Sequence, residues 1–407
     1  MYKKKIVRLA IILLPLSFIL SQCFTNNSSI KDDPRGTNYA GSATCISCHK
    51  NIYKSYLHTA HFMASGPASD STIRGSFAKD SNEFVFNPHL KVVMDKRDSG
   101  FYQTSFVNGK ADQSHRFDIS FGGVKGQSYA YWFTNELFQL PVSYECRVHK
   151  WINSPGYEPD RVVFERVVNT RCLDCHVSYI KSAKPELPGF YEGVEGYEKK
   201  SLIYSIDCER CHGPSAEHVK FHTDNPGEKK AKFIITFSSL TRDQKINMCA
   251  ICHSGAGNRM LKPTFEFKPG DTLAKYMVVN NKLPLDYKNI DVHGNQKALL
   301  ASSKCFIKSN MDCSTCHDTH VKDRDMPTLY AGKCMTCHSS DSHIQCKLTG
   351  QLSSSMLINN CVSCHMPAFP SKTIVVGQAG AMVHTHHIGI YPEEAQKILT
   401  YLKTKVN

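Results

Sequence analysis

The stretch Cys208-Glu209-Arg210-Cys211-His212 is one copy of the pattern Cys-x-x-Cys-His, which occurs seven times in this chain of 407 residues. The residue frequencies predict roughly 0.04 copies by chance, so composition does not explain the repeat. The pentads supply fourteen cysteines, which are Cys45, Cys48, Cys172, Cys175, Cys208, Cys211, Cys249, Cys252, Cys313, Cys316, Cys334, Cys337, Cys361 and Cys364. Each pentad ends in a histidine: His49, His176, His212, His253, His317, His338 and His365.

Two thiols three positions apart lie on one helical turn, where each can bond one vinyl group of a porphyrin. The histidine that follows directly can then ligate the iron. This pattern is typical of c-type haem attachment, and it predicts seven covalently bound haem c groups. Structural zinc centres also use paired Cys-x-x-Cys, but they do not require a histidine after every second cysteine. A disulfide framework is a weaker alternative, because only four of the 18 cysteines lie outside the pentads.

The first 22 residues have the features of a signal peptide. Three lysines precede an apolar run over residues 6–20, and a fourth cation, Arg8, lies near its start. The run is too short for a committed membrane span. The sequence Leu20-Ser21-Gln22-Cys23 resembles a bacterial lipobox, although Gln22 replaces the usual small residue, so we expect lipidation at Cys23. Residues 23–40 then form a polar tether. We expect an exported lipoprotein of the periplasm or outer membrane, with a soluble periplasmic protein as the alternative.

The basic charge does not indicate nucleic-acid binding. The formal net charge of +13 falls to about +2 once the leader cations are removed and each ferric haem is counted as about −1. No stripe of Lys and Arg alternates with stacking aromatic residues. The lysines are better explained as counter-charges for haem propionates.

The spacing of the pentads divides the chain. About 127 residues separate the first pentad from the second, whereas the other six follow closely. In the long gap, residues 116–121 alternate polar with apolar, residues 101–106 and 128–133 are rich in aromatics, and Asn108-Gly109 is a hairpin dipeptide. We expect a small antiparallel sheet within residues 84–144. It serves either as a docking or substrate module or, by the simpler interpretation, as packing that covers a haem face.

The predicted fold is mainly α with long irregular connections. About 55 residues are available for each haem, so the porphyrins themselves would supply much of the buried apolar surface. We expect a first-haem segment with the β-rich insert at 41–170, a six-haem core at 171–390 and a C-terminal helix at 391–407. Pro392 with two following glutamates marks the start of that helix.

The sixth ligand of each iron must come from the 13 histidines outside the pentads. His218 and His320 are the strongest candidates, because each stands a few residues behind a pentad and can reach a neighbouring haem. The next candidates are His61, His293, His343 and one of His384, His386 and His387, of which we choose His386. Met63 or Met366 could also ligate, although methionine more often fills a core.

Residues around the pentads resemble a known family. The motifs are Gly41-Ser-Ala-Thr-Cys-Ile-Ser-Cys-His with His61 behind it, Leu140-Pro-Val-Ser-Tyr with Ser154-Pro-Gly-Tyr, Cys208-Glu-Arg-Cys-His-Gly-Pro-Ser-Ala-Glu-His, and Cys361-Val-Ser-Cys-His-Met-Pro. They resemble the exported multihaem cytochromes c related to the tetrahaem carrier of ammonia oxidisers and to the wider hydroxylamine-oxidoreductase-like group. The resemblance spans nearly the whole mature chain. It implies stacked haems in parallel or perpendicular pairs, mostly ligated by two histidines, that carry electrons.

Two further cysteines fit this pattern. Cys305 precedes the fifth pentad and Cys346 follows the sixth, and a disulfide between them would clamp that region. Unpaired thiols rarely persist in an oxidising compartment, which favours the bond. Cys146 then remains single, as a buried small hydrophobic residue.

The function predicted from the sequence is electron transfer along covalently bound haems outside the cytoplasm. The expected partners are redox proteins or a quinol-linked membrane complex, with the membrane reached through the lipid anchor. One alternative is a reductase or oxidase of a small nitrogen or sulfur compound at one open-coordinate haem. Another is a lipid-anchored subunit of a larger respiratory complex.

Overall fold

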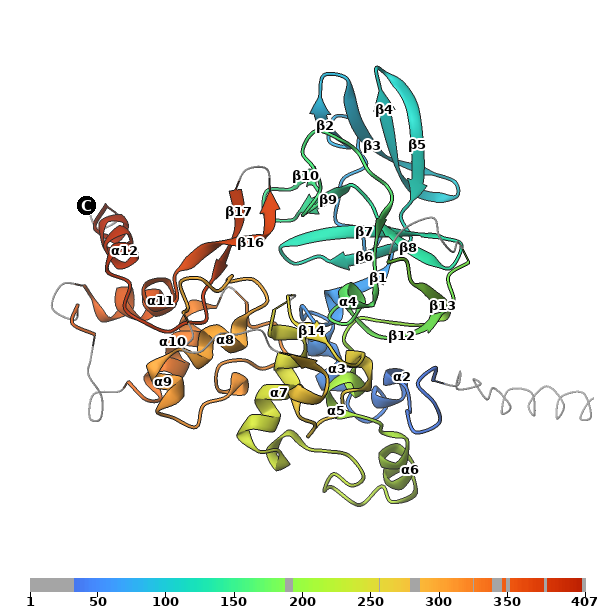
Figure 1. Cartoon of the computed structure of the whole chain (residues 1–407). Helices are drawn as coiled ribbons and strands as arrows, with labels where there is room; N and C mark the ends of the chain where they lie inside the picture. The colour runs from blue at the N-terminus through green and yellow to red at the C-terminus, as the bar shows by residue number, and fades with distance from the viewer. Residues whose placement is uncertain are drawn as a thin grey trace, which may run out of the picture.

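The computed structural model describes residues 33–186, 193–255, 257–278, 286–324, 326–338, 346–348, 352–376 and 379–404. Strands of the N-terminal half gather into antiparallel sheets at the upper right of Figure 1, and most of the helices lie below and to the left of them. None of the helices in these ranges combines the length and the hydropathy that a membrane span requires.

The smaller of the two sheets has four strands. They are β2 (Glu83–Asn87), β3 (Leu90–Arg97), β4 (Gly100–Val107) and β5 (Lys110–Arg116), in chain order. Asn108 and Gly109 join β4 to β5 with φ of 48° and 78°, as the favoured two-residue hairpin turn requires. Val92, Met94 and Phe101 of β3 and β4 are buried on one face. The hairpin predicted at Asn108-Gly109 is therefore confirmed.

The larger sheet has nine strands. Its main path runs through β1 (Ser65–Pro67), β6 (Ile119–Gly122), β7 (Gly126–Phe133), β8 (Glu136–Gln139), β13 (Gly196–Tyr204) and β12 (Val177–Ala183), while β9 (Val142–Glu145) pairs with β7 and β10 (Lys150–Asn153), and β11 (Arg166–Val167) pairs with β8. Successive residues of β7 point to opposite faces. Tyr129 and Tyr131 thus enter one hydrophobic cluster, and Ala130 enters another.

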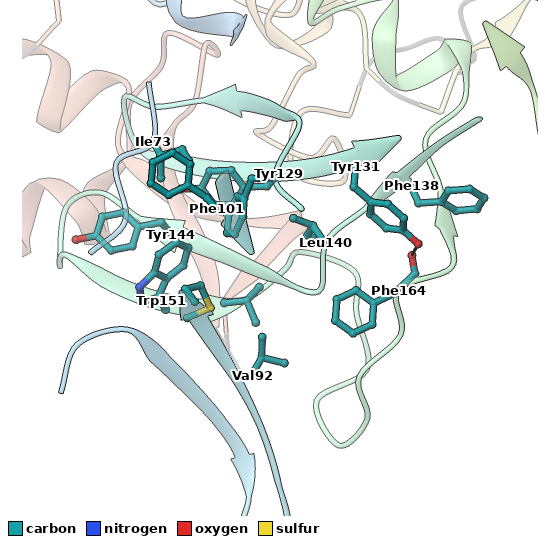
Figure 2. Packing of buried hydrophobic residues seen from close by; sticks show 13 residues of the cluster. Ile73, Val92, Phe101, Tyr129, Tyr131, Phe138, Leu140, Tyr144, Trp151 and Phe164 are labelled. Atoms are coloured by element: carbon teal, nitrogen blue, oxygen red, sulfur yellow. Dashed lines mark hydrogen bonds between the residues drawn. The ribbon is translucent and has the colours of Figure 1, made fainter. Parts of the chain in front are cut away.

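Aromatic residues fill the first cluster, which both sheets share (Figure 2). The ring of Trp151 lies 5.8 Å from that of Tyr129 and 5.1 Å from that of Tyr144, and its indole N–H donates to the Ser76 carbonyl at 2.8 Å. The Tyr131 hydroxyl donates to the Phe164 carbonyl at 3.1 Å. Offset and edge-on contacts of this kind stabilise a core beyond the area that they bury.

The expectation of a mainly α fold with a small β insert is wrong. Helices hold 29% and strands 26% of the residues. The nine-stranded sheet takes strands from residue 65 to residue 204, far outside the predicted 84–144. The physical reason is that the aromatic side chains of this half bury one another, so the segment builds a core of its own instead of wrapping around porphyrins.

The pentads lie on or beside short helices. These are α2 (Ser42–Cys45), α3 (Lys50–Tyr56), α4 (Thr170–Leu173), α5 (Cys208–His212), α6 (Ala216–Asp224), α7 (Arg242–His253), α8 (Gln296–Ala301), α9 (Lys304–Ile307), α10 (Pro327–Met335), α11 (Ser354–His365) and α12 (Pro392–Thr404). Single 3-10 turns are η1 (Phe62–Ala64), η2 (Phe237–Ser239), η3 (Thr264–Glu266), η4 (Leu273–Lys275) and η5 (Cys313–Thr315). Two ribbons complete the fold: β14 (Arg259–Met260) with β15 (Met277–Val278), and β16 (Ala368–Val376) with β17 (Ala379–His384). The predicted start of the last helix at Pro392 is confirmed.

The second hydrophobic cluster connects the large sheet to the helical half. Ile119 and Leu137 of the sheet pack with Leu173 of α4, and all three are almost completely buried. Leu173 is the second residue of the pentad at 172–176. The sheet therefore rests directly on that pentad and fixes its position.

Candidate haem-binding sites

A cavity of about 4360 Å³ runs through the helical half. The cysteines and the histidine of every pentad line it. Pockets for a single small molecule usually measure about 300–1,000 Å³, so this space is several times larger than one such ligand requires. We number the pentads one to seven in chain order: 45–49, 172–176, 208–212, 249–253, 313–317, 334–338 and 361–365.

Helix caps and helix ends position several pentads along the cavity. The pentad three sequence forms the whole of α5, and the Asp207 carboxylate caps this helix by accepting from the Arg210 N–H at 2.8 Å. A capping box of Thr241 and Gln244 starts α7, which ends at His253. Helix α11 likewise ends at a pentad histidine, His365. One helical turn thus holds both thiols and the imidazole of a pentad close together.

Four pentad histidines each face a second histidine across the cavity. The ring centroids are 6.4 Å apart in His49–His218, 6.4 Å in His61–His253, 6.0 Å in His212–His320 and 6.2 Å in His317–His386. Metal–imidazole bonds are about 2 Å long, so two imidazoles on opposite sides of one metal ion have centroids about 6 Å apart. The four pairs therefore fit an iron held between two histidines.

Hydrogen bonds fix the orientation of several pentad rings. The Nδ1–H of His365 donates to the Gly389 carbonyl at 2.8 Å, and that of His253 to the Gln296 side-chain oxygen at 3.3 Å. The Nδ1 of His317 lies 3.1 Å from the Asp323 carboxylate. A carbonyl or carboxylate acceptor requires the proton to be on Nδ1, which leaves Nε2 free to bind a metal.

One distal ring has the same hydrogen-bonding support, and burial favours the neutral form of two others. The Nδ1–H of His218 donates to the Lys232 carbonyl at 2.8 Å. Burial, with a smaller contribution from neighbouring histidines, lowers the pKa of His61 and of His386 to about 4. Burial also lowers the pKa of His212. Neutral imidazole is the ligating form, so these rings are ready to bind a metal at neutral pH.

The other predicted ligands occupy different positions. His293 lies close enough to His176 to lower its pKa, although burial of His176 contributes more. The ring of Phe121 meets His176 edge-on at 5.7 Å. His387 stacks on Tyr287 at 3.6 Å, which leaves His386 as the member of the 384–387 group that faces a pentad. His343 lies outside the described residues, as does Cys23, the predicted lipidation site.

Cys305 and Cys346 are both free thiols in the structure, and the disulfide between them stays a prediction. They lie beside different pentads. Cys305 interacts electrostatically with Cys337 of pentad six, whereas Cys346 interacts with Cys361 of pentad seven. Cys146 packs half-buried against the first hydrophobic cluster, as expected.

Sequence reasoning missed a buried charge cluster centred on Arg35. Its guanidinium lies 2.9 Å from Asp33, 2.8 Å from Asp207 and 3.1 Å from Glu209, and its side chain is only 5% exposed. Glu209 also accepts the backbone N–H groups of Ala40 and Gly41 at 2.9 Å each. This cluster, the Arg35 clamp, fastens the segment before pentad one to pentad three. Within the predicted tether at 23–40, Arg35 and Ala40 are thus bound to Asp207 and Glu209. The acidic residues around Cys208 were the available signal for a cationic partner.

Comparisons with known proteins agree with this geometry. The family described as cytochrome c554 and c-prime matches residues 147–213, which contain pentads two and three. The multiheme cytochrome MtrA of Shewanella baltica (strain OS185) is 28% identical in an alignment of 186 residues that covers 41% of this chain and 52% of that protein. The chain thus matches about half the length of this curated relative.

A solved structure shows a similar fold. The outer cell wall cytochrome OcwA aligns with a TM-score of 0.52 over 88% of this chain and 81% of its own, at 16% sequence identity. With the pentads, these findings support the class of multihaem c-type cytochromes, which bind haem c covalently and transfer electrons. The narrower relation to the carrier of ammonia oxidisers and to the hydroxylamine-oxidoreductase-like group stays a prediction.

Proposed function

We propose that this protein is an extracytoplasmic c-type cytochrome that carries seven covalently bound haems and transfers electrons along them. The main supporting observation is the set of four facing histidine pairs, whose centroid separations of 6.0–6.4 Å match an iron between two imidazoles. The single cavity that all seven pentads line supports the number of haems.

The chain's residues suit a carrier. Haem c, when bound, supplies one-electron exchange between ferric and ferrous iron. The facing imidazoles would hold a bound iron from both sides, so its change of charge would require little movement of these side chains. Hydrogen bonds to Gly389, Gln296 and Lys232 keep the ligand rings in place.

The N-terminal sequence supports the proposed location of the protein. A basic and apolar leader followed by a lipobox-like Cys23 supports export and a lipid anchor in the periplasm or outer membrane. Redox proteins or a quinol-linked membrane complex are the proposed partners. The Cys23→Ala variant should leave the membrane fraction, whereas the Cys146→Ala control should remain in it.

Intact-mass analysis of protein matured in a competent host tests the number of haems. We expect seven haem adducts, six in the Cys208→Ala/Cys211→Ala variant and seven in the Cys146→Ala control. Fewer adducts than pentads in the parent protein, or bound zinc, would contradict the proposal.

Electron paramagnetic resonance (EPR) then separates a carrier from an enzyme. Ferric haems with two histidine ligands give low-spin signals. A high-spin signal that shifts with nitrite or hydroxylamine, together with turnover, would favour the reductase or oxidase alternative.

A further inference from the structure

Contacts at the pentads show which of them are neighbours. Helix α2, which ends at Cys45, packs against α5, and the Cys208 backbone N–H donates to the Ser42 hydroxyl at 3.3 Å, so pentads one and three are neighbours. The Cys175 thiol donates to the Cys252 carbonyl and the Cys252 thiol to the Asp174 carbonyl, both at 3.8 Å, so pentads two and four are neighbours. Helix α7, which carries Cys249, packs against the 3-10 turn η5, which begins at Cys313, so pentads four and five are neighbours. Because the pentad thiols carry the porphyrin edges in the proposed haem protein, each contact identifies two adjacent attachment sites.

Weaker interactions extend this order in both directions. Cys211 of pentad three interacts electrostatically with Cys249 and Cys252, so pentad three adjoins pentad four. Cys334 of pentad six interacts with Cys316 of pentad five and Cys361 of pentad seven.

A ring contact supports the link from five to six. Tyr330 of α10, the helix that leads into pentad six, lies edge-on to His317 of pentad five at 5.5 Å. Pentads one, three, four, five, six and seven thus form a continuous series of neighbours.

Pentad two has a different position. Among the described residues, its thiol hydrogen bonds with other pentads run to pentad four, from Cys175 to the Cys252 carbonyl and from Cys252 to the Asp174 carbonyl. Pentad three reaches it through a polar contact instead, in which Arg210 donates to the Asp174 carbonyl at 3.4 Å. On its other side lies the large sheet, where Phe121 of β6 meets the His176 ring and the Ser65 hydroxyl donates to the His176 carbonyl at 2.7 Å. Pentad two therefore lies between pentad four and the sheet.

We propose that pentads one, three, four, five, six and seven form a row and that pentad two is a side branch at pentad four, which ends at the nine-stranded sheet. The inference rests on the proposed function, because it assumes haem at every pentad. The proposed array is branched and has three ends. Two are the ends of the row, and the third is pentad two, beside the nine-stranded sheet.

EPR of fully oxidised protein tests the branch, because neighbouring ferric haems couple magnetically. In Cys172→Ser/Cys175→Ser, we expect the loss of one haem signal and a change in the signal of one other haem. In the matched variant Cys249→Ser/Cys252→Ser, we expect the loss of one signal and changes in three, from the neighbours at pentads two, three and five. Intact mass must show seven haems in the parent and six in each variant.

A milder variant guards against misfolding of the cysteine variants. Phe121→Ala keeps all seven pentads and should alter the signal that Cys172→Ser/Cys175→Ser removes. Changes in two or more other signals after loss of pentad two, or an effect of Phe121→Ala on a different haem, would overturn the branch. Fewer than seven haems in the parent would contradict the proposed function itself.

Discussion

Replacing Arg35 should destabilise the contact between pentads one and three. The substitution Arg35→Met keeps much of the side-chain volume but removes the positive charge that Asp33, Asp207 and Glu209 share. Three carboxylates would then face one another in a site where Arg35 is only 5% exposed. Removing one partner from a buried ion pair costs about 3–5 kcal/mol, and we expect a loss of this size in the free energy of unfolding.

Guanidinium denaturation of the haem-loaded protein, followed by far-UV circular dichroism, measures this loss. The shift of the transition midpoint, multiplied by the slope, gives the change in free energy. A local consequence should accompany it. Because the clamp holds α2 against α5, the EPR signal of the haem between His49 and His218 should change in Arg35→Met.

Lys91→Met is the matched control. Lys91 lies 2.8 Å from Glu83, but the two side chains are 42% and 41% exposed. Exposed pairs of this kind contribute about 0–1 kcal/mol. If Arg35→Met costs no more than Lys91→Met, the clamp does not stabilise the fold and the reasoning from burial is refuted.

Three further predictions concern other parts of the molecule. His61→Ala removes the ring that faces His253 and should add one high-spin EPR signal. His387 stacks on Tyr287 instead, so the control His387→Ala should add none. Equal spectra of the two variants would exclude His61 as a ligand. Burial alone would raise the pKa of Asp33, but hydrogen bonds from Arg35 hold it below its usual 3.8. The stability that Asp33 contributes is therefore present above pH about 4 and is lost as the pH falls through its lower folded pKa; denaturation midpoints between pH 5 and pH 2 should depend less on pH in Asp33→Asn. A Cβ on Gly75 would lie 2.1 Å from the Trp151 ring, so Gly75→Ala should cost about 1–3 kcal/mol in thermal denaturation, and an unchanged melting temperature would show that Trp151 can move aside.

The pentads and several distal histidines were predictable because their signals are local. His218 and His320 stand shortly behind a pentad, and both face a pentad histidine in the structure. Which pentad histidine each distal histidine faces was not predictable. His218 faces His49, more than 160 residues earlier in the chain, and the two are brought together by the packing of α2 against α5 and by the hydrogen bond from the Ala216 N–H to the Asn38 carbonyl. Sequence spacing carries no information about such contacts.

The β content was underestimated for a similar reason. Hairpin signals such as Asn108-Gly109 identified individual strands, but the pairing of β8 with β13 joins residues about 60 positions apart. The Arg35 clamp also combines residues that are distant in the sequence, and Arg35 itself lies in a segment whose composition suggests a tether. Composition predicts the conformation of a segment on its own, whereas the buried ion pairs of Arg35 hold this segment against the rest of the fold.

The crossing of histidines between pentads affects the biogenesis of the protein. In the proposed haem protein, the second imidazole for pentads one, three and five would come from a later part of the chain: His218, His320 and His386. A chain synthesised from its N-terminus cannot complete the coordination of these sites until residue 386 has emerged. Premature termination or proteolytic nicking near the C-terminus would therefore damage a site in the middle of the molecule, and the protein cannot be shortened there without loss.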